Sequence, residues 1–264
     1  MKNVLEFAAA KAAGSRISMV TCYDACLAAV LEASAVDCLL VGDSAAMVMH
    51  GHPDTLAATV ELMALHTAAV RRGAPTRFLI ADLPFLSFRK GVPAALDAVA
   101  ALMRAGANAV KLEGVAGHED VITAIAGSGV PVMGHLGLTP QSVHALAGFR
   151  VQGRTDEDAA QILADARLLE SLGCFALVLE CVPSPLALRI TEALQIPTIG
   201  IGAGAGCDGQ VLVLQDLLGL SGEFRPRFVR RYLDGSALVR DAVGRFDRDV
   251  KQGVFPGPDE EYRS

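Results

Sequence analysis

Ionisable side chains follow five of the short apolar runs in this sequence, either directly or after one glycine. In chain order they are Asp43, Asp82, Glu113, His135 and Glu180. If the runs are neighbouring parallel strands, their carboxyl ends meet at one face of the protein, where such side chains act together. A single residue of this kind could be a helix cap or a loop charge. Five at successive run ends predict an active site that uses acid–base or metal chemistry.

Three of the four carboxylates among these residues are candidate metal ligands, with no Cys or paired His close by in the sequence. They are Asp43, Asp82 and Glu113. Hard oxygen donors suit Mg²⁺, which takes one or two carboxylates and completes its shell with water and substrate oxygens. Crowded carboxylates otherwise repel and raise one another's pKa, and a divalent ion removes that repulsion. We therefore expect Asp43, Asp82 and Glu113 to lie at a Mg²⁺ ion.

Lys111 lies two residues before Glu113 on the same predicted strand. Residues two apart on a strand point to the same side. The Lys111 ammonium is therefore expected beside the metal, where it neutralises the carboxylate of an anionic substrate.

Glu180 ends the apolar run 176–179. Burial tends to raise a carboxyl pKa, which suits a general base that takes and returns a proton near neutral pH. The alternative is that Glu180 caps the helix expected after Pro183. For His135, a hydrogen-bonded structural role and a catalytic role both stay open.

Two other motifs are weaker. His50 and His52 have the spacing of a same-face pair and could bind a transition metal, but no third ligand is evident, so a loop role is favoured. The run 200–206 contains a string similar to GxGxxG without the helix and downstream acid of a dinucleotide site. We interpret that run as a tight backbone approach at the active face that holds an anion or substrate.

The elements that must position these residues alternate along the chain. Eight apolar runs predict strands, at residues 17–23, 38–41, 78–81, 109–112, 130–133, 175–179, 198–201 and 210–214. Helical spacing predicts helices at 25–33, 57–72, 93–105, from 118, at 156–172 and as a final pair within 227–251. Little helix fits between the last two strands. This alternation predicts a single-domain (β/α)₈ barrel over residues 1–264, with C-terminal helices and a short tail, rather than an open doubly wound sheet.

Length and composition agree with this fold class. The 264 residues suffice for a barrel of about 250, and 52% hydrophobic residues exclude a mainly disordered chain. A net charge of −6 without a Lys/Arg block argues against a nucleic-acid partner. The sequence contains no uninterrupted run of about 18 apolar residues, so no membrane span is predicted. The first residues lack the apolar core of a secretion signal. Six cysteines without a CxxC pair favour reduced thiols and a cytoplasmic location.

The same run ends carry longer strings that are similar to one family. The chain resembles the ketopantoate hydroxymethyltransferases, the folate-dependent enzymes that open pantothenate synthesis, from about residue 17 to residue 256. The matching strings are VGDS (41–44), HTAAVRRGAP (66–75), ADLPF (81–85), KLEG (111–114), GHLGLTPQS (134–142), VQGR (151–154), LECVP (179–183), IGIGAG (199–204) and DGQ (208–210).

The resemblance implies roles for individual residues. Asp43, Asp82 and Glu113 would bind Mg²⁺, and Glu180 would be the proton acceptor. The expected substrate-binding residues are Asp43, Ser44, Asp82, Lys111 and His135.

The resemblance also implies the reaction and the assembly. A hydroxymethyl group would pass from 5,10-methylenetetrahydrofolate, the co-substrate, to the α-keto acid 3-methyl-2-oxobutanoate. The product, 2-dehydropantoate, would form through a Mg²⁺-stabilised enolate. A ring-like homo-oligomer, often a decamer, is implied as well.

One departure from the family pattern lies beside the expected metal. After VGDS the family usually continues with Leu-Gly, and here Ala45 and Ala46 follow. If the glycine serves an unusual backbone angle or a close ligand approach, Ala46 is expected to reshape this loop and alter the substrate fit.

Two alternatives to this reaction remain. One is another Mg²⁺-dependent enolate enzyme of the phosphoenolpyruvate mutase or isocitrate lyase type, although the Lys-Cys-Gly-His-like loop of isocitrate lyase is missing. The other is a non-catalytic barrel that serves as an assembly protein.

Overall fold

The computed structural model describes residues 1–222 and 226–262. Internal contacts divide the chain into two compact units, Met1–Val213 and Leu214–Ser264, and each is described by itself. The first unit contains all eight strands and every candidate site residue. One domain over the whole chain stays a prediction.

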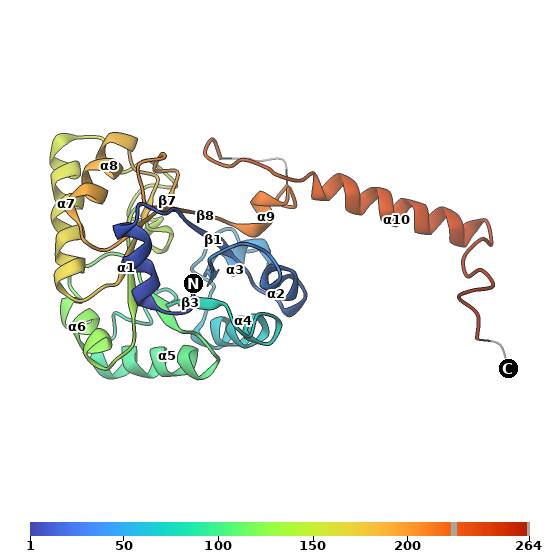
Figure 1. The fold of residues 1–264 in the computed structure, drawn as a ribbon, viewed down its shortest axis with the longest axis horizontal. Helices are drawn as coiled ribbons and strands as arrows, with labels where there is room; N and C mark the ends of the chain where they lie inside the picture. Colours follow the sequence, from blue (N-terminus) through green and yellow to red (C-terminus); the bar gives the residue numbers. More distant parts are fainter. Residues whose placement is uncertain (223–225, 263–264) are drawn as a thin grey trace. The chain divides into compact units, whose positions relative to one another are not determined.

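The first unit is a closed barrel of eight parallel strands, as predicted (Figure 1). Each strand pairs with the next one in sequence, and β8 closes the barrel on β1. The strands are β1 Ile17–Thr21, β2 Cys38–Val41, β3 Phe78–Asp82, β4 Ala109–Lys111, β5 Val132–Gly137, β6 Ala176–Glu180, β7 Thr198–Ile201 and β8 Gly209–Leu212.

Helices surround the strands in Figure 1. They are α1 Val4–Ala12, α2 Ala25–Glu32, α3 Ala45–Val48, α4 Val60–Gly73, α5 Val92–Arg104, α6 Glu119–Gly127, the 3₁₀ helix η1 Pro140–Ser142, α7 Asp156–Ser171 and α8 Ser184–Ala193. Side chains cap the starts of α2, α4 and α7, where Asp24, Thr59 and Thr155 accept hydrogen bonds from free backbone N–H groups. Pro93 lies in the first turn of α5, where its missing N–H removes no helical bond.

Alternate residues of the strands fill the barrel interior. This inner core consists of Phe7, Ile17, Met19, Cys38, Leu40, Phe78, Ile80, Ala109, Met133, Ala176, Val178, Ile199 and Val211. The intervening strand residues, such as Leu39 and Leu79, are also buried, because helices cover the outer surface of the barrel. Both faces of a strand are therefore apolar, which explains why the sequence shows continuous apolar runs.

Polar residues continue the inward-facing rows at the carboxyl ends of the strands. Each lies two positions after a core residue: Asp82 after Ile80, Lys111 after Ala109, His135 after Met133 and Glu180 after Val178. Because side-chain direction repeats every two residues, these groups point into the mouth of the barrel, above the apolar core.

Several predicted boundaries were wrong. The fifth strand begins after Pro131 and extends to Gly137, so His135 lies within β5 instead of following it. Asp82 and Glu180 are likewise the last residues of their strands. The helices α1 and α3 were not predicted, whereas the strands 38–41 and 198–201 were predicted at the residues observed.

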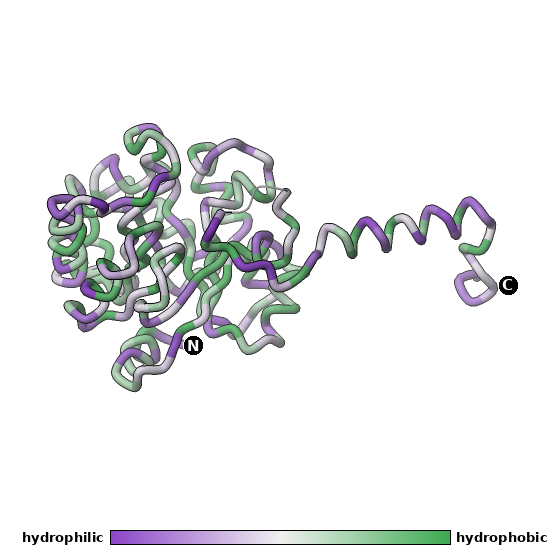
Figure 2. The backbone as a smooth tube through the Cα atoms, turned by 90° about the horizontal axis from the view of Figure 1, so that it is seen from above, coloured by the Kyte–Doolittle hydropathy of each residue, from purple (hydrophilic) through white to green (hydrophobic). Residues whose placement is uncertain are grey.

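The second unit contains the short helix α9 Leu214–Leu217 and the long helix α10 Gly235–Lys251. The predicted final pair of helices within 227–251 was wrong, because residues 227–234 form turns and irregular structure and α10 is the only helix in that range. Hydrophilic and hydrophobic segments alternate along α10 in Figure 2. No helix within the described residues is long and apolar enough to cross a membrane.

The helix α1 closes the apolar core with one aromatic side chain, and this predicts a stability effect. Phe7 is 0% exposed, and its ring centroid lies 5.2 Å from those of Phe78 and Phe175. Phe7→Ala leaves a cavity and should lower the free energy of unfolding by about 3–5 kcal/mol in urea denaturation. Leu5→Ala, on the same helix at 76% exposure, should change it by less than about 0.5 kcal/mol. Equal effects of the two variants would show that α1 does not seal the core.

Candidate active site

The mouth of the barrel brings the predicted site residues together. Asp43, Asp82, Lys111, Glu113 and His135 are all buried. The Glu180 side chain is 16% exposed and lies beside His135, with its Oε2 atom 3.2 Å from Nε2 of the imidazole. The interactions below connect these residues into one cluster.

Asp82 and Lys111 form a buried ion pair that the sheet register dictates. They are direct partners across β3 and β4. Their inward side chains meet with Lys111 Nζ 2.9 Å from Asp82 Oδ1. Burial alone would lower the pKa of Lys111, but the carboxylates of Asp82, Glu113 and Asp43 outweigh it and raise the pKa above its usual value. Among the buried residues that the structure describes, Lys111 is the only Lys or Arg.

Asp43 and Glu113 are buried carboxyl groups that share the positive charge of Lys111 with Asp82. Burial, followed by the charge of Asp82, raises the pKa of Asp43 to about 7, although Lys111 and a hydrogen bond from Gln141 oppose the rise. Burial, followed by the charge of Asp43, raises the pKa of Glu113 well above its usual value. Placing these carboxylates together is therefore unfavourable until a further cation balances them.

His135 is neutral, and its neighbours determine where its proton lies. Burial and the adjacent Lys111 charge hold its pKa well below the usual value. Nδ1 lies 3.3 Å from Lys111 Nζ, and an ammonium can only donate, so Nδ1 accepts and the proton is on Nε2. This buried Nε2–H has no hydrogen-bond partner within the described residues, although Glu180 Oε2 is nearby. It is thus a donor available to a substrate oxygen or, after a small rotation, to Glu180.

Glu180 has the properties expected of a base that works near neutrality. Burial raises its pKa to about 7, and the charge of Lys111 limits the rise. Pro183, and not Glu180, is the residue at the N-terminal cap of α8. The capping alternative from the sequence is therefore wrong.

Ser44 takes part in a contact that the sequence did not predict. The Tyr23 hydroxyl and Ser44 Oγ lie 2.7 Å apart, and Tyr23 is fully buried. Ala45 and Ala46 begin the helix α3 beside it, and neither is among the described residues with a left-handed backbone. A helical position does not require glycine, so the backbone-angle reason does not apply at Ala46, and an effect of Ala46 on ligand approach stays a prediction.

Gln141, like Tyr23, is a residue of this cluster that the sequence did not predict. Its backbone N–H donates to Glu113 Oε2 at 2.9 Å. Its side-chain Nε2 donates to Asp43 Oδ2 and to the Leu83 carbonyl, both at 2.9 Å. Only its place within the string GHLGLTPQS gave a sequence signal, and that signal named no role.

The donor set fits Mg²⁺ in its chemistry but not as a preformed three-carboxylate cage. No three His, Cys, Asp or Glu side chains in residues 1–222 and 226–262 form a group that could hold a metal ion. Lys111 contacts Asp82, and Gln141 contacts one oxygen each of Asp43 and Glu113. Glu113 Oε1 is buried without a hydrogen-bond partner. Because Mg²⁺ needs only one or two carboxylates, these residues can hold it together with substrate oxygens.

The weaker motifs lie elsewhere. His50 and His52 lie in the turn and loop after α3, which confirms the favoured loop role, and His50 Nε2 lies 2.9 Å from His66 Nε2. In the run 200–206, a Cβ on Gly204 would overlap Ser184 Oγ at the start of α8. The close backbone approach is therefore to the protein's own helix.

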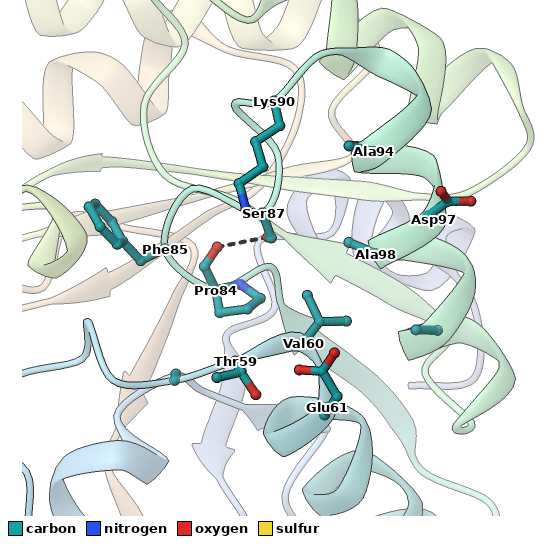
Figure 3. A pocket seen from close by; sticks show the side chains of 12 residues that line it. Thr59, Val60, Glu61, Pro84, Phe85, Ser87, Lys90, Ala94, Asp97 and Ala98 are labelled. Atoms are coloured by element: carbon teal, nitrogen blue, oxygen red, sulfur yellow. Dashed lines mark hydrogen bonds between the residues drawn. The ribbon is translucent and has the colours of Figure 1, made fainter.

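A separate cavity of about 550 Å³ opens between the start of α4, the turn at 84–90 and residues 94–101 of α5 (Figure 3). None of the predicted site residues lines it. Its lining is Ala58, Thr59, Val60, Glu61, Pro84, Phe85, Ser87, Lys90, Ala94, Asp97, Ala98 and Ala101.

Comparisons with known sequences identify relatives over the whole length. The family model described as ketopantoate hydroxymethyltransferase matches residues 1–258. A 3-methyl-2-oxobutanoate hydroxymethyltransferase of Bdellovibrio bacteriovorus is 54% identical over 262 residues, which are 99% of this chain and 100% of that protein. The protein of the same name from Coxiella burnetii is 52% identical, over 96% of both chains.

Solved structures with the same fold are more distant in sequence. A phosphonopyruvate hydrolase solved with oxalate and Mg²⁺ has a TM-score of 0.64 at 12% identity, over 100% of this chain and 92% of that one. A 2,3-dimethylmalate lyase of the PEP mutase/isocitrate lyase superfamily has a TM-score of 0.61 at 17% identity, with the same coverage. At such identities these structures support the barrel fold alone.

The raised pKa of Glu180 predicts a pH-dependent stability effect in metal-free protein. A carboxyl whose pKa rises from 4.5 to about 7 on folding stabilises the fold below pH 4.5, and that contribution is lost as pH rises through 7. Glu180→Gln removes this loss, so urea unfolding at pH 8.5 should show the variant more stable than the parent by about 2–3 kcal/mol. The difference should shrink steadily as pH falls to 5.

Glu192→Gln, an exposed carboxyl on α8, controls for the removal of one negative charge. A Glu180→Gln difference that stays constant from pH 5 to pH 8.5 would contradict a raised pKa.

Proposed function

Because the chain belongs to the ketopantoate hydroxymethyltransferase family, we propose that this hydroxymethyltransferase converts 3-methyl-2-oxobutanoate into 2-dehydropantoate, at the start of pantothenate biosynthesis. The one-carbon donor in this proposal is 5,10-methylenetetrahydrofolate. The observation that carries it is the family match over residues 1–258, which coincides with a single buried cluster of acidic, basic and imidazole groups.

We propose that Asp43, Asp82 and Glu113 are the residues that hold Mg²⁺. When bound, the ion supplies positive charge to the carboxylate and keto oxygens of the substrate, and so stabilises the charge that develops on deprotonation. The excess of carboxyl groups over the single buried ammonium supports this assignment. Ser44, fixed by Tyr23 at 2.7 Å, is a candidate hydrogen-bond donor to the bound acid.

Glu180 is the proposed base. The C3–H bond breaks, its electron pair passes into the enolate, and the proton moves to a Glu180 oxygen. A pKa of about 7 allows Glu180 to take this proton and release it at neutral pH. The Nε2–H of His135, 3.2 Å from Glu180, can hold that carboxylate or a substrate oxygen in place.

Lys111 completes the proposed charge balance. Its ammonium stays protonated because three carboxylates surround it, so it offers a fixed positive charge to the enolate. Water adds to the methylene carbon of the donor while both C–N bonds of that carbon break, and N5 and N10 take up the two protons of the water, which gives tetrahydrofolate and formaldehyde. The nucleophilic C3 carbon then bonds to the formaldehyde carbon, and its oxygen takes the proton held by Glu180 to give 2-dehydropantoate.

The related enolate chemistry of the PEP mutase and isocitrate lyase superfamily is the second candidate, because a member of that superfamily shares the barrel. Identities of 50–54% to named hydroxymethyltransferases, against 12–18% to the solved superfamily structures, favour the first candidate. The same family membership disfavours a non-catalytic barrel.

We further propose a homo-oligomer, and a cytoplasmic location also stays a proposal. On α10, five large apolar side chains are exposed, and such side chains are typical of association surfaces. They are Leu238, Val239, Val243, Phe246 and Val250.

Removal of the proposed base separates catalysis from binding. Glu180→Gln should lower kcat for 2-dehydropantoate formation by about 10³-fold or more, because the amide cannot accept the C3 proton. The Kd for 3-methyl-2-oxobutanoate with Mg²⁺, measured by calorimetry, should change by less than about threefold, since the variant keeps the size of the side chain.

Glu192→Gln should leave both quantities unchanged. If Glu180→Gln abolished binding together with turnover, Glu180 would be a structural residue and another base would be required.

A further inference from the structure

One buried glutamine links the ends of three successive strands. Gln141 lies on η1, after β5, and is 7% exposed. It donates three hydrogen bonds of 2.9 Å, to Asp43 after β2, to the Leu83 carbonyl after β3 and to Glu113 after β4. Apart from Leu83, its partners are two of the carboxylates in the cluster.

The chemistry of these partners fixes the orientation of the side-chain amide. A carbonyl oxygen can only accept, so the group that faces Leu83 must be the NH₂ group. The second hydrogen of the same nitrogen then points to Asp43 Oδ2. Both amide hydrogens are used, and exchanging the amide nitrogen and oxygen would break two contacts at once.

Gln141 holds one oxygen of each carboxylate. On Glu113, Oε2 accepts from the backbone N–H of Gln141, while Oε1 is buried without a hydrogen-bond partner. On Asp43, Oδ2 accepts from the side chain. Two like-charged groups that would otherwise turn away from each other are thereby kept at the mouth of the barrel. Removing a group that holds metal ligands in this way commonly weakens metal affinity by about 10–100-fold.

We infer that Gln141 is a positioning residue, which orients Asp43 and Glu113 for a divalent cation and the α-keto acid. This inference rests on the proposed function, because it takes those two carboxylates as the cation-binding groups. Gln141 acts through them and does not itself touch the reacting atoms. Its loss should weaken cation binding and leave the chemical step intact once the site is filled.

The test uses Mn²⁺ as a paramagnetic probe. Gln141→Met keeps the length of the side chain and the backbone N–H to Glu113, but removes both amide hydrogen bonds. Titration of the purified protein, followed by electron paramagnetic resonance with and without 3-methyl-2-oxobutanoate, should give a Kd for Mn²⁺ about tenfold or more above that of the parent. In turnover assays the same variant should need correspondingly more metal, and its kcat at saturating metal should lie within about threefold of the parent value.

Two further variants make the result interpretable. Gln141→Asn retains a polar group but shortens it by one methylene, so it should weaken Mn²⁺ binding even if the methionine variant folds poorly. Thr191→Val is the matched control, since Thr191 is also 7% exposed and its hydroxyl lies 2.6 Å from that of Thr198 at the amino end of β7. This control should lose stability without any change in Mn²⁺ affinity.

The outcomes distinguish this inference from the function it rests on. Parent-like Mn²⁺ affinity in both Gln141 variants, with only a lower Tm, would overturn the positioning role and leave the proposed function standing. A large fall in kcat that saturating metal does not restore would also overturn it. If the parent protein itself bound no Mn²⁺, with or without the keto acid, the metal part of the proposed function would fail and this inference with it.

Discussion

The crowding of carboxyl groups around one ammonium is the constraint that shapes this protein. Asp43, Asp82 and Glu113 are buried beside Lys111, and burial penalises every unpaired charge. Burial raises the pKa values of Asp43 and Glu113, and the neighbouring carboxylates, which one lysine cannot balance, raise them further. Such an arrangement is stable when protons are taken up or when a divalent cation binds. The shortage of positive charge beside these carboxylates is therefore the physical reason to expect a bound metal ion, which can in turn hold an anionic substrate.

The barrel meets this constraint by stacking a polar layer on an apolar one. Below the mouth, the inward positions carry apolar residues, with Phe7 of α1 closing the core. Two residues further along each strand, the same rows carry Asp82, Lys111, His135 and Glu180. Because backbone hydrogen bonds of eight strands fix these rows, the charged groups stay close without many bonds between their side chains. The hydrogen-bonded sheet therefore positions these charged side chains without needing a bound metal.

Local sequence predicted the barrel well because strands buried on both faces appear as short apolar runs, as at 198–201. It failed where a run is interrupted, since Pro131 and the polar His135 hide the true extent of β5. The ionisable residues at the run ends also predicted most members of the buried charged cluster at the mouth of the barrel. The contact of Gln141 with Asp43 could not be predicted this way. A neutral residue in a loop has no distinctive pattern, and its partner lies on a distant strand that only the closed barrel brings near.

Metal-dependent enolisation without the folate donor is the most direct test of this account. Purified protein would be incubated in D₂O with 3-methyl-2-oxobutanoate and Mg²⁺, and the C3 proton signal would be followed by NMR. We predict loss of that signal above the protein-free rate, dependent on Mg²⁺ and abolished by chelation. No exchange, either alone or with tetrahydrofolate present, would contradict the assignment of the barrel mouth as a site where a carboxylate removes the C3 proton.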